Sequence, residues 1–567
     1  MWMDWLKNFS SRFQNVQYED SVQNKIEKLV WDQFPSIASY MKTQQKSCSF
    51  KSLACLVGSI TPDDFEVGTH LEIHKRLNFK FVSKVLGFTE EDRNQYQIQA
   101  TEIADTAFRR IDVTLREIAS QDVRFNVTSV ADILRIIDNT VDDHNNNKSK
   151  NMHFNLLPPY KALLIQHVVS FITLFFTNEE DAYTRRHSLR GQLEEYRETA
   201  WQLFKNVLEK KTEDHITAVF FKQALAKSVI DHVIDLIPLD IQETMMLKFS
   251  HQKYSIIRDV MEYIAEHGDF EECYRYISDP NTFVQEWLTK QMHTCIFDKM
   301  QGNRNQYAIF AQKHVRKICI EIEKAVEGAS TAAGNKFSRN IKCHSPVKRW
   351  MASFSSQLNN AHVLPISEYN FSHVTEKSDI DVINFTQIVL EQLKETEETI
   401  CRYFMNTNSN NIKWKISPVK QLMDQLWGCT STCPFCSEPC KSTDKDHTEL
   451  GVDHQCLQHR IEGFYGTKWK HSDKLVISFC NVDVQCDTLL FSYQNKGCEE
   501  EWIAYKEYKT KYPQWYIEPS PDTSKYWMWM LCRYQKEFEA KHKRKFESIP
   551  RSWKNLSMKE ALRSLKH

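Results

Sequence analysis

The chain has 567 residues, of which only 13 are glycine, and its formal net charge is −1. A single hydrophobic core rarely grows beyond about 250–300 residues, so we expect two to four domains or one extended array. Glycine lies well below its usual level of about 7%, which disfavours tight turns and hairpins and favours long helices. The near-zero net charge excludes a global field that would draw the protein to nucleic acid or to an anionic membrane.

The N-terminal residues Met1 to Leu6 lack the basic flank and the apolar run of a signal peptide. A protein without a secretion signal stays in a reducing compartment, where disulfides are rare. We therefore expect the 16 cysteines to be free thiols or metal ligands. The predicted location is the cytoplasm, with the nucleus as an additional compartment.

Most of the chain before Trp427 is expected to be helical. Apolar residues recur there three or four positions apart, which predicts amphipathic helices that pack against neighbours. Ser129 followed by Asp132 predicts the start of a further helix. Gly328 is expected to end the helix that carries the stripe from Ala311 to Ala325. The clearest apolar stripes are Ile103, Ala107, Ile111, Leu115 and Ile118; Ala311, Val315, Ile318, Ile322 and Ala325; and Val382, Phe385, Val389, Leu393, Ile400 and Tyr403.

The most apolar stretch runs from Ala162 to Phe176 and is interrupted by Gln166 and His167. A helix that spans a bilayer needs roughly 20 apolar residues, and this stretch is shorter. We therefore predict a buried core helix rather than a membrane span.

Polar segments divide the chain. Residues 142–150 are expected to form a loop, and the stretch from Gly328 to Pro346 is the best candidate for a linker. The predicted fold is mainly α: an elongated multi-helix stalk or bundle, followed by a small α+β zinc-binding C-terminal module. The predicted domains are a helical stalk or bundle over 1–335, a further helical segment over 345–428, and a Cys/His-rich α+β module with C-terminal helices over 429–567.

The predicted C-terminal module has a distinctive composition. A β-like run covers Leu475 to Phe479, and Ser557 with Glu560 predicts a capping box for a late helix. The stripe Trp527, Leu531, Tyr534 and Phe538 is expected to pack one helix onto the module. Eight cysteines fall in the same region: Cys429, Cys433, Cys436, Cys440, Cys456, Cys480, Cys486 and Cys498.

Two short motifs predict a structural zinc site in this module. Cys433 and Cys436 form a C-x2-C knuckle, and His454 and His459 form an H-x4-H pair. Zinc takes four N/S ligands in a tetrahedron, and four protein ligands leave no open position for catalysis. The alternative ligands are Cys440, His447 and Cys456. Because their spacing is loose, Cys480, Cys486 and Cys498 are interpreted as core thiols rather than as a second site. Buried thiols beside surface histidines would explain two cysteines, but not this density of Cys and His.

We find no catalytic centre and predict that the chain is not an enzyme. The string from Gly328 to Phe337 superficially resembles a phosphate-binding loop. It has one residue too many and Phe337 where a magnesium-binding hydroxyl is needed, and it follows a helix instead of a strand. No nucleotide is therefore expected to bind. His314 and His373 are interpreted as ordinary surface or capping residues. The basic cluster Lys541, Lys543, Arg544 and Lys545 is interpreted as a solvated helix face.

Several low-frequency strings resemble the interferon-inducible very large GTPase family. They begin with Cys433-Pro-Phe-Cys436 and Asp453-His454 through His459-Arg460, and they are densest from Pro418 onward. Further strings are Leu475 to Cys480, Tyr505 to Tyr508, Tyr512 to Trp515, Ser524 to Trp527, Ile549 to Trp553 and Glu560 to Leu565. Weaker ones lie upstream, namely Asn155 to Tyr160, Ala200 to Phe204 and Phe249 to Tyr254.

The resemblance implies a dynamin-like GTPase of innate immunity, represented here by its helical stalk and zinc-bearing tail. The family's GTPase domain has no counterpart in this sequence, which fits either a truncated gene product or a stand-alone paralogue. The predicted function is a non-catalytic assembly or interaction region that self-associates or contacts a GTPase domain. The alternatives are a zinc-dependent module that recognises protein or nucleic acid, and part of a GTP-binding protein whose GTPase domain is missing. Nucleic acid is the less favoured partner.

Overall fold

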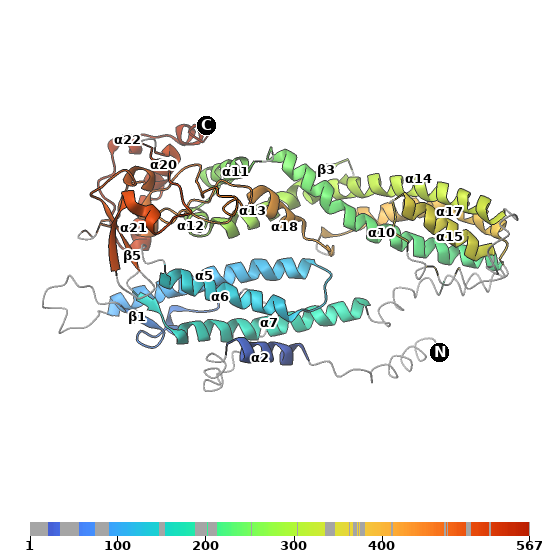
Figure 1. The fold of residues 1–567 in the computed structure, drawn as a ribbon, viewed down its shortest axis with the longest axis horizontal. Coiled ribbons are helices and arrows are strands. Elements are labelled where there is room, and N and C mark those ends of the chain that lie inside the picture. The colour runs from blue at the N-terminus through green and yellow to red at the C-terminus, as the bar shows by residue number, and fades with distance from the viewer. Residues whose placement is uncertain are drawn as a thin grey trace.

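The computed structural model shows an elongated, mainly α protein (Figure 1), which confirms the predicted fold class. Long helices run side by side along the molecule, and the C-terminal segments gather at one end (Figure 1). The structure describes residues 21–34, 56–73, 90–146, 154–187, 201, 212–250, 252–302, 304–334, 346–361, 363–366, 371, 374, 380–409, 412–469, 472, 474–494, 500–520 and 523–565.

An N-terminal helical unit has its own hydrophobic core. Its side chains include Phe108, Ile133, Tyr160 and Ile172, none of which is exposed to solvent. The elements are α2 (Val22–Gln33), α5 (Glu90–Ser120), α6 (Val127–Asn146), α7 (Pro158–His187) and the antiparallel pair β1 (Leu71–Ile73) and β2 (Phe154–Leu156).

Helix α7 contains the apolar stretch predicted to be a core helix. By length and composition it is the one described helix that passes the test for a membrane span. Its apolar side chains are nevertheless buried against the other helices of the unit, among them Ile165, Val168 and Phe176. The predicted core helix is therefore confirmed.

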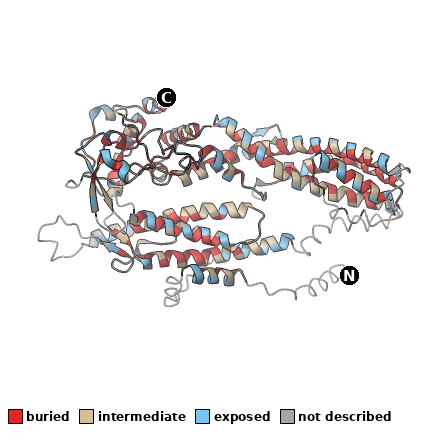
Figure 2. Cartoon of the chain, viewed as in Figure 1, coloured by how far each residue is buried: buried red, intermediate tan, exposed pale blue. Residues whose placement is uncertain are grey.

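Four long helices form a bundle at the other end of the molecule. They are α10 (Glu213–Lys248), α14 (Gln306–Gly334), α15 (Pro346–Asn360) and α17 (Val382–Asn406). Buried residues line the faces that they turn toward one another (Figure 2). The ring of Phe221 lies against those of Trp350, Phe354 and Phe385 at centroid distances of 5.3, 5.2 and 5.8 Å. The stripes predicted from sequence on α14 and α17 are part of this core, except that Tyr403 is 47% exposed.

Short helices connect the bundle to the C-terminal module. They are α11 (Lys253–Glu266), α12 (Phe270–Ser278) and α13 (Pro280–His293). Asp269 and Asp279 cap the last two by accepting hydrogen bonds from the backbone N–H groups of Glu272 and Thr282. Their apolar residues share one continuous core with the bundle and with Trp527 and Phe538 of the C-terminal module.

The C-terminal module contains little regular structure. An antiparallel hairpin pairs β5 (Leu490–Gln494) with β6 (Glu500–Ala504). The helices are short, namely α19 (Cys480–Asp483), α20 (Lys525–Arg533), α21 (Gln535–His542), α22 (Arg551–Lys554) and α23 (Met558–Arg563). The predicted capping box of Ser557 and Glu560 starts α23 as expected.

Three local predictions are wrong. Helix α14 continues past Gly328, where a Cβ atom would collide with the Gln357 side chain of α15, so this glycine permits close packing instead of ending the helix. Helix α6 begins before Ser129, where the Asn126 side chain accepts from the N–H of Thr128, and it extends through residue 146 of the predicted loop. Leu475 to Phe479 forms isolated bridges and no strand.

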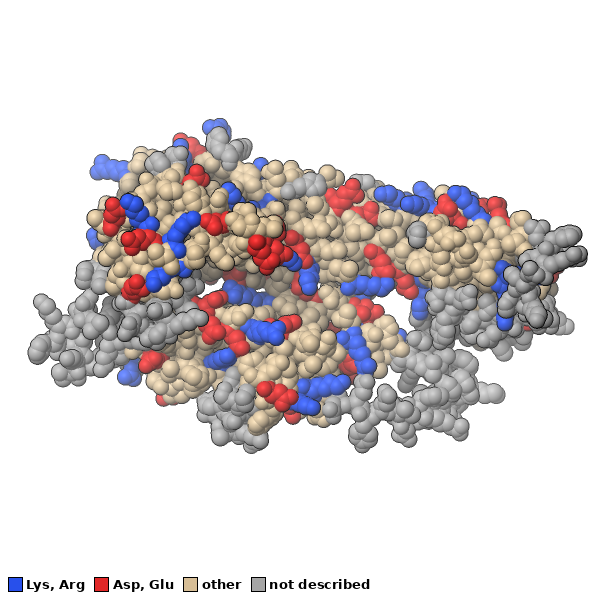
Figure 3. Space-filling view, viewed as in Figure 1, with Lys and Arg blue, Asp and Glu red and all other residues tan. Residues whose placement is uncertain are grey.

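The N-terminal unit meets the rest of the protein along a polar seam. Arg110 of α5 pairs with Asp279 at 2.6 Å, and Lys541 of α21 pairs with Glu102 of α5 at 2.8 Å. Charged side chains of both signs are visible along this junction in Figure 3. The two cores are thus separate, while the bundle and the C-terminal module share one. The predicted domain boundaries stay a prediction.

Candidate metal centre

The chain enters the centre through a strained turn. Helix α18 (Pro418–Leu422) and the π-helical turn Met423–Trp427 end at Gly428, whose φ is 64°. A Cβ atom on Gly428 would overlap the backbone of Thr443. Only glycine fits there without a backbone shift, and the turn delivers Cys429 into the module.

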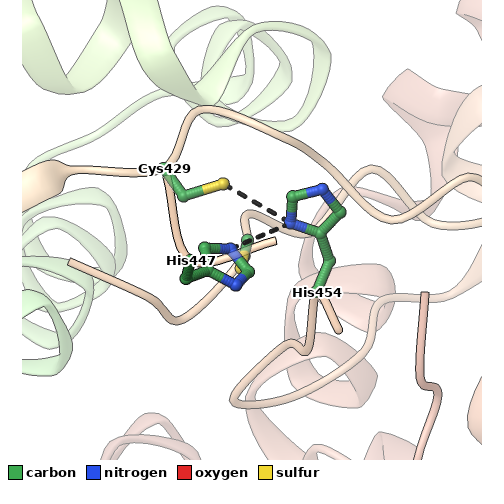
Figure 4. Close-up of side chains that lie close together, drawn as sticks. Cys429, His447 and His454 are labelled. Carbon is green, nitrogen blue, oxygen red and sulfur yellow. Dashed lines mark hydrogen bonds between the residues drawn. The ribbon is translucent and has the colours of Figure 1, made fainter. Parts of the chain in front are cut away.

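Four buried residues form one group of potential ligands, the two-cysteine cluster: Cys429, Cys440, His447 and His454. The Sγ atom of Cys429 lies 3.5 Å from Nδ1 of His454, and that nitrogen lies 3.1 Å from Nε2 of His447 (Figure 4). The Sγ atom of Cys440 lies 3.5 Å from Nε2 of His447. All four potential ligand atoms are within 4.8 Å of one another.

Four other buried residues form a second group, the three-cysteine cluster: Cys433, Cys436, His459 and Cys480. The Nδ1 atom of His459 lies 3.3 Å from the Sγ of Cys436 and 3.1 Å from the Sγ of Cys480. The sulfurs of Cys433 and Cys480 are 3.8 Å apart. Cys480 comes from the first turn of α19, 21 residues after His459.

Both clusters have the dimensions of a zinc site. Zn–N and Zn–S bonds of about 2.0–2.3 Å give a tetrahedron with edges of roughly 3.3–3.8 Å. The separations given above, from 3.1 to 3.8 Å, fall close to that range, and all ligand atoms of a cluster lie within 4.8 Å of one another. The donor sets are those of structural zinc, so the residues fit the predicted metal. The arrangement can fix a fold, and it offers no open coordination position.

The structure does not gather the predicted ligands Cys433, Cys436, His454 and His459 around one point. Cys433, Cys436 and His459 lie in the three-cysteine cluster, while His454 joins the two-cysteine cluster. The single predicted quartet is therefore replaced by two. The physical reason is the position of the Cys433–Cys436 knuckle, whose cysteines face Cys480. His454 lies instead against the ring of Trp515.

The alternative ligands also separate. Cys440 and His447 belong to the two-cysteine cluster. Cys456 belongs to neither quartet, and its thiol donates to the carbonyl of Glu438 at 3.2 Å. The Cys486 thiol is hydrogen-bonded to the Thr488 hydroxyl outside both clusters. Cys498 lies outside the described residues.

Backbone hydrogen bonds hold the ligands in place. The N–H of Cys433 donates to the carbonyl of Glu438 at 2.8 Å, and Ser437 closes the knuckle with a positive φ of 49°. The Nδ1 atom of His447 lies 2.9 Å from the carbonyl of Val452, which leaves Nε2 for an ion. The N–H of His454 donates to the carbonyl of Gln514 at 2.7 Å.

The thiols differ in how easily they ionise. A hydrogen bond from Cys440 lowers the pKa of Cys429 to about 4. Burial alone would raise the pKa of Cys433, yet hydrogen bonds from Cys436, Cys456 and Cys480 hold it well below its usual range. One thiolate in each cluster is thus stabilised by its neighbours, and thiolates are the form that binds metal.

A buried ion pair lies beside the three-cysteine cluster. Glu438 and Arg460 are both fully buried, and Arg460 Nε donates to Glu438 at 2.5 Å. The guanidinium also donates to the carbonyl of Ile277 at 2.9 Å and stacks near the rings of Tyr276 and Trp527 at 4.8 and 5.0 Å. Arg460 thereby connects the metal-binding loops to helix α12.

The module is attached to α11, α12 and α13 mainly through the ends of these helices. Terminal helix carbonyls lack partners within their own helix. Tyr534 donates to Gly268 at 3.0 Å and Arg460 donates to Ile277, both at such ends. Lys253, which is buried, donates to the carbonyl of Cys429 at 2.7 Å, and burial lowers its pKa to about 8.

The remaining sequence predictions concern residues outside the clusters. The string from Gly328 to Gly334 is helical, which rules out a phosphate loop over those residues. The His314 ring is hydrogen-bonded to the carboxylate of Asp240, and His373 lies outside the described residues. In the basic cluster, Lys541 pairs with Glu102 and Lys545 with Glu539 at 2.7 Å.

Sequence reasoning missed Cys429 as a ligand and interpreted Cys480 as a core thiol. A count of the Cys and His residues against the number of ligand positions would have pointed to these two cysteines. One four-ligand site leaves Cys440, His447 and Cys456 unused, and adding Cys429 supplies enough Cys and His for a second ion. Spacing alone does not show which residues share an ion, because that depends on how the loops pack.

Comparison with known proteins identifies the C-terminal module. The family model described as "Interferon-induced very large GTPase 1, C-terminal domain" matches residues 429–565. The protein named "Interferon-induced very large GTPase 1" from Mus musculus is 22% identical over 350 residues, which cover 60% of this chain and 13% of that relative. No solved structure matches the chain significantly. The predicted family resemblance is confirmed, and the matching family model describes a C-terminal domain.

Proposed function

We propose that this chain, whose residues 429–565 match the family model described as "Interferon-induced very large GTPase 1, C-terminal domain", is a non-catalytic assembly and interaction region built around two structural zinc ions. The observation that carries this proposal is the pair of complete, buried Cys/His quartets at the junction of the module with the helices. With zinc bound, the two-cysteine cluster is formally neutral and the three-cysteine cluster carries one negative charge.

In this proposal the zinc ions reinforce the small hydrophobic core around the ligands, which includes Phe435, Phe491 and Tyr505. The module's helices have nine residues or fewer, and its one described hairpin has five-residue strands. Such elements bury too little apolar surface to be stable alone. Zinc in small sites contributes roughly 10–16 kcal/mol at neutral pH, which is enough to define the fold.

The helical region is proposed to supply the contacts with other proteins, either a second copy of this chain or a GTPase domain. Supporting observations are large apolar side chains exposed on the bundle, including Leu247, Ile320 and Ile383 at 64%, 54% and 74% exposure. Single exposed apolar residues are common on soluble proteins, so these residues do not define a partner. They are positions at which substitutions can test the proposed contacts.

Metal analysis of the purified full chain tests the zinc proposal. We expect two zinc ions per chain, and one ion each in Cys440→Ser and Cys480→Ser, because each variant removes one quartet. The matched control is Cys486→Ser, whose thiol contacts Thr488 outside both clusters and which should keep two ions. Equal zinc content in all four proteins would contradict the assignment.

Light scattering over a range of concentrations tests the assembly proposal separately. Self-association should appear as a rise in mass that Ile320→Asp or Ile383→Asp reduces. A constant monomer mass, together with no binding to a GTPase domain of the family, would contradict this part and leave the zinc assignment intact. A location in the cytoplasm or nucleus stays a prediction.

A further inference from the structure

A cavity of about 260 Å³ lies beside the β5–β6 hairpin, outside both metal clusters. Its volume is somewhat below the roughly 300–1,000 Å³ of sites for drug-sized ligands, and it suits one side chain or a small organic molecule. Its lining is rich in aromatic residues: Phe435, Trp469, Phe491, Trp502 and Tyr505.

The aromatic wall is rigidly packed at its base. The Phe435 ring lies 5.0 Å from both Phe491 and Tyr505, centroid to centroid. Phe435 is the second residue between the knuckle cysteines, so the three-cysteine cluster fixes its position. Trp469 and Trp502 are only partly buried, and Trp469 donates its indole N–H to Glu547 at 2.6 Å. The cavity therefore has a fixed aromatic floor and two indoles nearer to solvent.

A buried carboxylate also lines this cavity. Glu462 is 2% exposed, and its Oε2 atom accepts a hydrogen bond from the Tyr505 hydroxyl at 2.8 Å. Its Oε1 atom is buried and accepts no hydrogen bond from the described residues. The Ser478 hydroxyl lines the same cavity and interacts with the side chain of Asp483. Burial of a carboxylate oxygen without a partner is costly, so this oxygen marks the place of a missing positive or donating group.

We propose that this cavity binds an alkylammonium group, the head of a lysine-type side chain from a protein segment. Burial raises the pKa of Glu462 well above its ordinary range, so its carboxyl is neutral in the absence of a cation. A cation gains from the faces of the aromatic rings, and its charge beside the unpaired Oε1 favours the ionised form of Glu462. A neutral apolar group would fill the cavity but would leave that oxygen unpaired.

The geometry favours ammonium over guanidinium. A guanidinium group binds a carboxylate best through two parallel hydrogen bonds, which require both oxygens. Tyr505 already occupies Oε2 of Glu462. Lys468 also lines the cavity but does not donate to Oε1 of Glu462, so this described cation does not fill the role.

Calorimetric titration of the zinc-loaded full chain tests this proposal with three probes. They are Nα-acetyl-lysine amide, its Nε-trimethylated form, and the neutral norleucine analogue. We expect at least one cationic probe to bind about tenfold or more tightly than the norleucine analogue. Preference for the trimethylated form would indicate a methylated side chain, and preference for the primary amine would indicate unmodified lysine with Ser478 as a second acceptor.

Two variants locate the site. Glu462→Gln keeps the shape and should abolish the preference for the cation, while Trp502→Leu should weaken cation binding about tenfold. The matched controls are Glu507→Gln, an exposed carboxylate of the same module, and Trp31→Leu, an exposed indole of helix α2. Both controls should bind like the wild type, and all variants should keep two zinc ions, which separates this test from that of the zinc proposal.

Three outcomes would overturn the proposal: no binding of any probe to a chain with full zinc content, equal binding of the neutral analogue, or unchanged cation selectivity in Glu462→Gln. Should Glu462→Gln fail to fold, crosslinking is a second measurement. A photoreactive lysine derivative should label the wild type near Trp502, and Trp502→Leu should lose that label.

Discussion

The four-helix bundle and the C-terminal module share one hydrophobic core but are stabilised in different ways. The bundle uses long helices whose apolar stripes face one another, so its stability is spread over many similar contacts. The module relies on a few specific groups, namely eight potential ligands, one buried ion pair and hydrogen bonds to helix ends. One substitution can therefore affect stability very differently in neighbouring parts of the same fold.

Removing the metal should separate the two regions most strongly. Loss of both zinc ions, each worth roughly 10–16 kcal/mol, exceeds the stability of a typical domain, about 5–15 kcal/mol, so the module should unfold. The bundle should keep its helices. Hydrogen exchange after treatment with a chelator should show lost protection over residues 429–520 and retained protection in α10, α14 and α17. Full protection of the module in protein verified to be metal-free would refute this expectation.

Breaking the buried ion pair should have the next largest effect. Arg460→Ala leaves the carboxylate of Glu438 buried and unpaired, which should cost about 3–5 kcal/mol of stability. Chemical denaturation should show an earlier transition for the module. Arg551→Ala, an exposed arginine in the same module, is the control and should change stability by less than about 0.5 kcal/mol.

A core substitution in the bundle should have a smaller and more confined effect. Ile322 on α14 is fully buried, and Ile322→Ala should cost about 3 kcal/mol through lost contacts and a cavity. Ile320→Ala on the exposed face of the same helix is the matched control. Zinc content should stay at two ions in both variants. Loss of zinc from Ile322→Ala would mean that the two regions are coupled more tightly than their different construction implies.

Mild acid should produce the smallest change. Burial lowers the pKa of His542 to about 4, and one ring nitrogen lies 2.9 Å from the carbonyl of Phe464. The unfolded pKa is about 6.5, so the stabilising contribution is complete above that pH and is lost as the pH falls toward 4. Between pH 7.5 and 5.5 the loss should be about 1 kcal/mol. With zinc in excess, His542→Gln should show a correspondingly shallower pH dependence; an unchanged slope would contradict the assignment to His542.

The same comparison explains what could be predicted from the sequence. The stripe of Val382, Phe385 and Val389 predicted a helix because its period is local, and the structure confirms it. Cys433 and Cys436 lie in one cluster, as their local C-x2-C spacing predicted. The placement of His454 and Cys480 in different clusters depends on contacts between distant segments, and no local pattern reports those contacts.

Gly328 and Asn126 illustrate a second kind of failure. Glycine near the end of a stripe usually terminates a helix, but here the close approach of Gln357 accounts for it. Asn126 caps α6 in place of Ser129, since several polar residues in succession can act as caps and tertiary packing selects among them.

The order in which the ligands occur along the chain also has a kinetic consequence. During synthesis all four residues of the two-cysteine cluster precede Cys480, so the first quartet is complete while the second still lacks one member. In that interval Cys433, Cys436 and His459 form an incomplete set, and His454 is the histidine that can complete it. If zinc binds during synthesis, the quartet suggested by spacing alone would compete with the final arrangement, as a mispaired disulfide does. Correct assembly would then need His454 to be held by Cys429, Cys440 and His447 until Cys480 arrives.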